Sequence, residues 1–166
     1  VAALKFAAWL LMGAAFAVHG KARAETALIL PAGGDADADK LLAVENAVLA
    51  SLRQQGFAVS LHRDLAQTQT ALRQCVDLEC TSQLPFSVRP GLAVAVAVWK
   101  GPDAAGEPLV VVTLLDASGR YPAQAQAPQD VLDAAQRALF QAQSLRLLGP
   151  GPWVSIAGSP NGADVM

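Results

Sequence analysis

The chain has 166 residues, of which 53% are hydrophobic and 16% charged, and its formal net charge is −2. The basic residues are scattered and form no run, which excludes the electropositive patch that nucleic-acid binding requires. A chain of this length can bury a core without metal or heavy disulfide support, so we expect one folded domain of ordinary size.

Residues 1–24 have the layout of a secretory signal peptide. Lys5 precedes the apolar run 6–18, and Ala22-Arg23-Ala24 supplies small residues at the two positions that signal peptidase reads. The run is shorter than the about 20 residues of a membrane span. We therefore predict cleavage after Ala24, a periplasmic or secreted mature protein, and no integral membrane span in it. The alternatives are an uncleaved anchor or the buried first helix of a cytosolic fold.

Cleavage would leave nine basic and fourteen acidic side chains, so the mature chain would be mildly acidic. No cysteine lies at the cleavage site, where a lipoprotein carries its lipid. This predicts a soluble rather than a lipid-anchored protein.

The first half of the mature chain alternates strand and helix patterns. Residues 26–31 are a short apolar run that predicts a buried strand, and the apolar spacing over 39–55 predicts an amphipathic helix. Asp35, Asp37 and Asp39 precede or open this helix. We interpret them as capping residues; a calcium loop is the alternative, although the later Gly and Glu of an EF-hand are missing.

A second strand is predicted over 57–62, and helix formers follow over 65–75. The two most strand-like segments, 92–99 and 109–116, come next and are rich in β-branched or alternating apolar residues. Residues 100–108 between them contain two glycines and two prolines, which favours a β-hairpin with a flexible tip.

The last third begins with a turn, since Asp116 and Gly119 occupy the first and fourth turn positions. An edge strand over 121–125 follows, because Pro122 fits only there. Pro128 is expected to open a final helix, which ends at Gly149.

The resulting order is β-α-β-α-β-β-β-α, which predicts an α/β fold with a mixed sheet of about five strands and helices packed on it. Helical crossovers make the first strands parallel, and hairpins make the later ones antiparallel. We divide the chain into a signal peptide (1–24), an α/β domain (25–148) and a linker with the start of a small β domain (149–166). Because the sequence stops within a strand pattern, we expect the natural protein to continue.

Cys75 and Cys80 are the only cysteines, and an exported chain enters a compartment where disulfides persist. On one continuous helix, residues five apart point about 140° away from each other. A bridge therefore requires a break, which Asp77 can supply by capping a short second helix. Free thiols, a metal site and a redox pair are the alternatives; two thiols are too few for structural zinc, and the spacing is not that of a redox motif.

The sequence gives catalysis little support. After cleavage His62 would be the sole imidazole, and we interpret it as a satisfied surface or edge histidine. No nucleophile elbow, zinc motif, phosphate loop or dinucleotide-binding turn occurs, and Gly33-Gly34 is interpreted as a turn. We predict no catalytic residue, no metal site and no cofactor.

A binding surface is expected where loops meet at the ends of the sheet. The hairpin tip 100–108 and the loop 32–39 are the candidates. The residues proposed for contact are Trp99, Lys100, Asp103 and Glu107. For Trp99, an ordinary core position is the alternative.

The tail suggests a family. Ser159-Pro160-Asn161-Gly162-Ala163-Asp164-Val165, with the lead-in Gly151-Pro152-Trp153-Val154, resembles the start of a PEGA repeat, with Asn161 in place of the usual Glu. PEGA repeats are small β modules found beside protein-binding and cell-wall-associated domains.

The body of the chain resembles the exported domains that precede PEGA repeats in bacterial envelope proteins. It is also distantly similar to the amino-terminal domain of the Tol-Pal propeller protein and to lipoprotein activators of peptidoglycan synthases. The resemblance implies a non-enzymatic envelope protein that binds an envelope protein or cell-wall component, or takes part in assembly. The alternatives are a structural spacer for C-terminal β repeats and an uncharacterised hydrolase that uses His62, Asp64 or Asp77.

Overall fold

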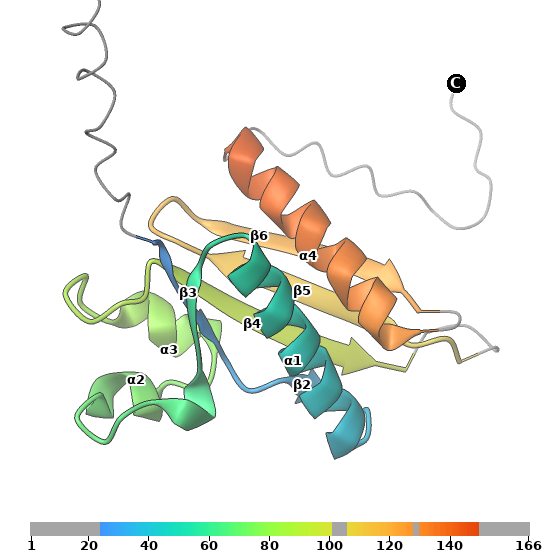
Figure 1. The fold of residues 1–166 in the computed structure, drawn as a ribbon, viewed down its shortest axis with the longest axis horizontal. Coiled ribbons are helices and arrows are strands. Elements are labelled where there is room, and N and C mark those ends of the chain that lie inside the picture. The colour runs from blue at the N-terminus through green and yellow to red at the C-terminus, as the bar shows by residue number, and fades with distance from the viewer. Residues whose placement is uncertain (1–23, 101–105, 128–129, 150–166) are drawn as a thin grey trace, which may run out of the picture.

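The computed structural model describes residues 24–100, 106–127 and 130–149. They form a six-stranded mixed sheet whose strands follow the order β3-β1-β4-β5-β6, with the short strand β2 paired to β4 (Figure 1). Residues 1–23 of the predicted signal peptide and the PEGA-like segment lie outside the described residues. Within those residues, no helix has both the length and the apolar character that crossing a bilayer demands.

The direction of the strands follows from their connections, as predicted. β1 (Thr26–Ile29) lies between β3 (Ala58–Leu61) and β4 (Leu92–Trp99) and is parallel to both. Hairpins then make β5 (Leu109–Leu115) antiparallel to β4, and β6 (Arg120–Gln126) antiparallel to β5. The predicted order of elements and the mixed α/β sheet are confirmed.

The glycine pair that we interpreted as a turn is a two-residue strand, β2 (Gly33–Gly34), parallel to the end of β4. At Gly34 the backbone has φ +114° and lies so close to β4 that a Cβ atom would stand 2.0 Å from the carbonyl oxygen of Val98. Only glycine permits this approach. At Gly33 a Cβ atom would meet nothing within 4 Å.

Two long helices cover one face of the sheet. Figure 1 shows α1 (Ala38–Gln54) and α4 (Val131–Leu148) side by side in front of the strands. Their apolar sides and the alternate residues of the strands that face them form the core. The largest fully buried members are Tyr121, Ile29, Leu52, Leu92, Leu114 and Leu139.

α4 begins later than predicted. Its first helical residue is Val131 rather than Pro128, because the carboxylate of Asp130 accepts the Leu132 N–H at 2.8 Å and caps the helix there. The end is as predicted: the helix stops at Leu148, and Gly149 follows with φ +75°.

The connection from β3 to β4 differs from the single helix predicted over 65–75. A short 3₁₀ turn (His62–Asp64) is followed by α2 (Thr70–Gln74) and α3 (Leu78–Gln83). Only the last five residues before Cys75 are helical. One reason is local, since the side chain of Gln69 accepts the Ala66 N–H at 3.0 Å and holds a turn in place of a helical start.

Cys75 and Cys80 form the predicted disulfide, with their Cα atoms 5.2 Å apart. The break between them is also as predicted. Asp77 is the N-cap of α3, and its carboxylate accepts the Cys80 N–H at 2.8 Å. The bridge therefore joins the residue that follows α2 to the first turn of α3.

Pro122 lies in β6, which is an edge strand, as predicted. Pro122 lies opposite Thr113 of β5. The Asp116 N–H bonds to the Gly119 carbonyl, and from that pair hydrogen-bonded and non-hydrogen-bonded pairs alternate along the two strands. The pair of Thr113 and Pro122 is therefore one that exchanges no backbone hydrogen bonds. The nitrogen of Pro122 therefore points away from the sheet. The missing N–H lies on the outer edge, where it removes a donor that another strand could use.

The second face of the sheet is only partly covered. α3 packs against β4, and Glu79 of α3 pairs with Arg120 of β6 at 2.6 Å, which covers the end of the sheet near Ala93. Beyond that end, half of the face stays partly exposed, with Trp99 49% exposed. We call this region the open sheet face; its residues are Ala95, Ala97, Trp99, Leu109, Val111 and Thr113.

Candidate functional site

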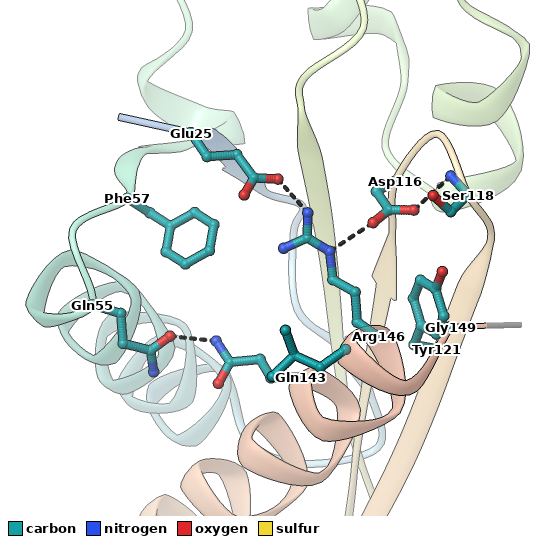
Figure 2. A pocket seen from close by; sticks show the side chains of 10 residues that line it. Glu25, Gln55, Phe57, Asp116, Ser118, Tyr121, Gln143, Arg146 and Gly149 are labelled. Carbon is teal, nitrogen blue, oxygen red and sulfur yellow. Dashed lines mark hydrogen bonds and ion pairs between the residues drawn. The ribbon is translucent and has the colours of Figure 1, made fainter. Parts of the chain in front are cut away.

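A pocket of about 600 Å³ opens where the last turns of α1 and α4 meet the start of β1 (Figure 2). Its lining combines two aromatic rings, two amides, two carboxylates and one guanidinium group. The lining residues are Glu25, Gln55, Phe57, Asp116, Ser118, Tyr121, Gln143, Arg146, Leu147 and Gly149. The volume lies within the range of small-molecule sites.

Arg146 is the central polar residue of this pocket. It lies in the last turn of α4, and its Nε donates to Asp116 Oδ2 at 2.6 Å. A terminal nitrogen of the same guanidinium pairs with Glu25, so two carboxylates from distant parts of the chain hold one cation (Figure 2). We call these three residues the Arg146 clamp. It joins the start of β1, the β5–β6 turn and the end of α4.

The clamp changes the ionisation of its members. Burial alone would raise the pKa of Asp116, but the hydrogen bond and charge of Arg146, with the backbone N–H groups of Ser118 and Gly119, outweigh it and lower that pKa. Burial likewise opposes the charge of Arg146, yet its two carboxylate partners raise its pKa further. Both groups are therefore charged near neutral pH. The formal charges of the two carboxylates and the guanidinium sum to −1.

The other side of the pocket is less polar. Figure 2 shows the half-buried ring of Phe57 pointing into the pocket, across from Arg146. Gln55, just after α1, and Gln143 of α4 form a side-chain hydrogen bond at its lower border. Tyr121 is buried beneath. The aromatic surface and the polar groups therefore face one another across one cavity.

The structure brings the predicted binding loops together at the opposite end of the β4–β5 ladder. Trp99 and Lys100 line a separate cavity of about 200 Å³ with Asp35, Asp37 and Lys40. The carboxylate of Asp35 accepts the Lys100 N–H at 2.7 Å, which fixes the loop against the strand end. Half-exposed Trp99 is not the core residue of the alternative interpretation.

The other two proposed contact residues do not line this cavity. Asp103 lies outside the described residues, and Glu107 is partly buried without lining it.

The acidic cap prediction for α1 is wrong in its details. Asp37 occupies the N-cap position, but its side chain makes no capping hydrogen bond and pairs instead with Lys40 at 3.5 Å. The carboxylate of Asp35 accepts the Lys100 N–H, as described above. In the described part of the chain, no three His, Cys, Asp or Glu side chains are grouped as metal ligands.

Sequence reasoning missed a buried carboxylate that holds the loop after β1. Glu45 of α1 is 8% exposed; it accepts the Ala32 N–H at 2.7 Å and pairs with Arg63. It therefore ties α1 to the loop 32–39 and to the 3₁₀ turn. The sequence signal for its burial was its position in α1, where it directly follows the core residue Val44.

The residues considered for hydrolysis are not assembled around a cavity. Asp77 caps α3, and neither His62 nor Asp64 lines the two cavities described above. We predicted a satisfied surface or edge histidine: His62 does follow the edge strand β3, but it is partly buried and its Nε2 has no hydrogen-bond partner among the described residues, so it is not satisfied.

No protein-family model matches the chain, and no curated protein matches it significantly. Among solved structures, a PelC dodecamer from Paraburkholderia phytofirmans is 18% identical with a TM-score of 0.41, covering 74% of this chain and 86% of that one. Lipoprotein GNA1162 from Neisseria meningitidis is 12% identical with a TM-score of 0.36, covering 75% and 98%. The hypothetical protein CT253 from Chlamydia trachomatis is 12% identical with a TM-score of 0.38, covering 75% and 95%. At these scores the likenesses assign no function to the chain.

Proposed function

We propose that this chain is a non-enzymatic exported protein that binds a protein partner of the bacterial envelope through its open sheet face. The observation that carries the proposal is the uneven covering of the second face of the sheet. Ala93 at one end of β4 is 1% exposed, whereas Trp99 at the other end is 49% exposed. On this face of β4, the residues between Ala93 and Trp99 are small, and along the strand they alternate with buried core residues.

The composition of this face suits a protein partner. Cross-strand pairs place Trp99 beside Leu109 and Ala97 beside Val111, which gives a continuous apolar strip two strands wide. Half-exposed aromatic side chains on a rigid strand are favourable anchors in protein interfaces. Lys100 and Gln124 at the border supply polar groups for a rim. The partner surface should therefore be apolar at its centre and hydrogen-bonding at its border.

The disulfide supports an extracytoplasmic location, because disulfides persist in oxidising compartments. The signal-peptide pattern of residues 1–24 supports the same location. The PEGA-like pattern after Gly151 supports a role at the cell envelope. Together these features favour an envelope partner over a cytosolic one.

Site-specific photo-crosslinking in intact cells tests the proposal. A crosslinker in place of Val111, at the centre of the open sheet face, should give one discrete adduct that mass spectrometry identifies as an envelope protein. The same group in place of Gln136, exposed on α4, should not. Trp99→Ala should abolish the Val111 adduct without unfolding the protein. An adduct that contains only a second copy of this chain, or no discrete adduct, would contradict partner binding, and the latter would favour the spacer alternative.

A further inference from the structure

We infer that the pocket around the Arg146 clamp is a binding site for a short saccharide that is neutral or positively charged. This site is distinct from the open sheet face, and the inference does not rest on the proposed function. The pocket lies near Leu115 and the face is anchored at Trp99, at opposite ends of the β4–β5 ladder. Six residues of strand separate those ends, a distance of about 20 Å.

The polar groups of the pocket are held in place before any ligand arrives. Arg146 is fixed by two carboxylates, and Asp116 also accepts the Ser118 and Gly119 N–H groups at 2.7 and 3.2 Å. Gln55 and Gln143 hold each other across the border between α1 and α4. A ligand would meet side chains whose rotamers are already restricted, which lowers the entropy cost of binding.

These groups also keep hydrogen-bonding capacity. Each glutamine amide has two N–H donors and a carbonyl with two lone pairs, so the single bond between Gln55 and Gln143 leaves donors and acceptors on both. A guanidinium has five donors, and the clamp uses Nε and one terminal nitrogen. The polar side of the pocket therefore offers both donors and acceptors. A hydroxyl group, which both donates and accepts, is the ligand group that satisfies such a lining.

The ring of Phe57 supplies the complementary surface. It points into the cavity opposite the polar groups (Figure 2). A pyranose ring has the same two-sided character, with an apolar C–H face that stacks on an aromatic ring and an equatorial belt of hydroxyls. A purely apolar ligand would cover the remaining N–H and carbonyl groups of the amides and the remaining guanidinium N–H groups without bonding to them, at a cost of about 1–3 kcal/mol for each group that it buries.

The charge of the site decides between saccharide classes. Glu25 and Asp116 surround a single guanidinium, so an anionic sugar would meet a net negative charge. A neutral sugar meets no such repulsion, and a protonated amine would be attracted. The site should therefore discriminate against uronic acids.

The test is a titration of the ¹⁵N-labelled, exported full chain followed by NMR. The probes are triacetylchitotriose, which is neutral, chitotriose, which is cationic, and trigalacturonate, which is anionic. We expect saturable shifts of the side-chain N–H signals of Gln55, Gln143 and Arg146 with the first two, at a dissociation constant of about 1 mM or tighter. Trigalacturonate should bind at least about tenfold more weakly, a difference of about 1.4 kcal/mol.

Variants separate the pocket from the rest of the surface. Phe57→Ala should abolish the shifts, and Gln143→Ala, at a partly buried position of α4 outside the hydrophobic core, should weaken binding at least about fivefold. Phe86→Ala, which removes the same ring from a site 77% exposed elsewhere, should leave binding unchanged. The inference is overturned if neither sugar gives saturable shifts, if Gln143→Ala binds normally, or if trialanine shifts the same signals more strongly than the sugars do.

Discussion

Replacing Arg146 with Met tests whether the clamp holds the fold together, because Met keeps most of the apolar stem of the side chain and removes its charge. The side chains of Arg146 and Asp116 are 23% and 11% exposed, and that of Glu25 is 41% exposed. Removing one partner of a fully buried pair costs about 3–5 kcal/mol, whereas an exposed pair contributes about 0–1 kcal/mol. For this partly exposed clamp we expect a loss of about 2 kcal/mol in the free energy of unfolding, or about 8 °C in Tm.

Urea denaturation of the exported protein at several pH values is the assay. Because the pKa of Asp116 is lowered in the folded state, its contribution is fully present above the ordinary value of 3.8 and is lost as the pH falls through the lowered value. The gap between wild type and Arg146→Met should therefore narrow below pH 3.8. Arg137→Met is the matched control, since its pair with Asp133 is 51% and 64% exposed and should contribute less than about 1 kcal/mol. Equal losses for the two variants, or a gap that is the same at every pH, would refute the reasoning.

Three further changes test other parts of the fold by the same denaturation assay. Gly34→Ala should cost at least about 3 kcal/mol or prevent folding, because its Cβ would collide with β4 at a positive φ, whereas Gly33→Ala should change stability by less than about 0.5 kcal/mol; similar effects at both positions would contradict the close approach. Replacing Cys75 and Cys80 together with Ala should cost about 2 kcal/mol, since the six-residue loop is no longer closed in the unfolded chain, and an unchanged midpoint would show that the bridge contributes nothing. Glu45→Ala should cost about 2 kcal/mol by leaving the Ala32 N–H without its partner, and Glu45→Gln about half as much because an amide oxygen can still accept; equal costs would argue against that hydrogen bond.

The parts of the fold that the sequence predicts are those determined by local patterns. Alternation of apolar residues over 92–99 and β-branched residues over 109–116 predict the two central strands, β4 and β5, and the turn at Asp116 determines how β6 returns. The disulfide and its cap at Asp77 could also be derived, because helix geometry forbids a bridge of that spacing without a break. The late start of α4 could not be, since Asp130 and Pro128 are both acceptable helix-start residues.

The pocket could not be predicted from the sequence, because the residues that line it come from distant positions in the chain. Glu25 and Arg146 are 121 residues apart, and each belongs to an element whose sequence pattern is ordinary. A basic residue in the last turn of a helix is expected from the helix dipole alone, so Arg146 gave no signal of its own. The proposed binding residues, by contrast, came from loops next to strand ends, and of these Trp99 and Lys100 line a cavity with the loop 32–39 whereas Glu107 does not.

The Arg146 clamp would also affect how the domain responds to a pulling force. Glu25 and Gly149 line the same pocket, so the points at which the polypeptide enters and leaves the described domain lie close together. A pulling force applied to the chain on both sides of the domain would load the ion pair between Glu25 and Arg146 together with the hydrogen bond from the Ala58 N–H to the Glu25 carbonyl. The clamp would be among the first contacts to be loaded under tension, and its rupture would separate the end of α4 from the start of β1. Resistance to stretching would then depend on salt and pH.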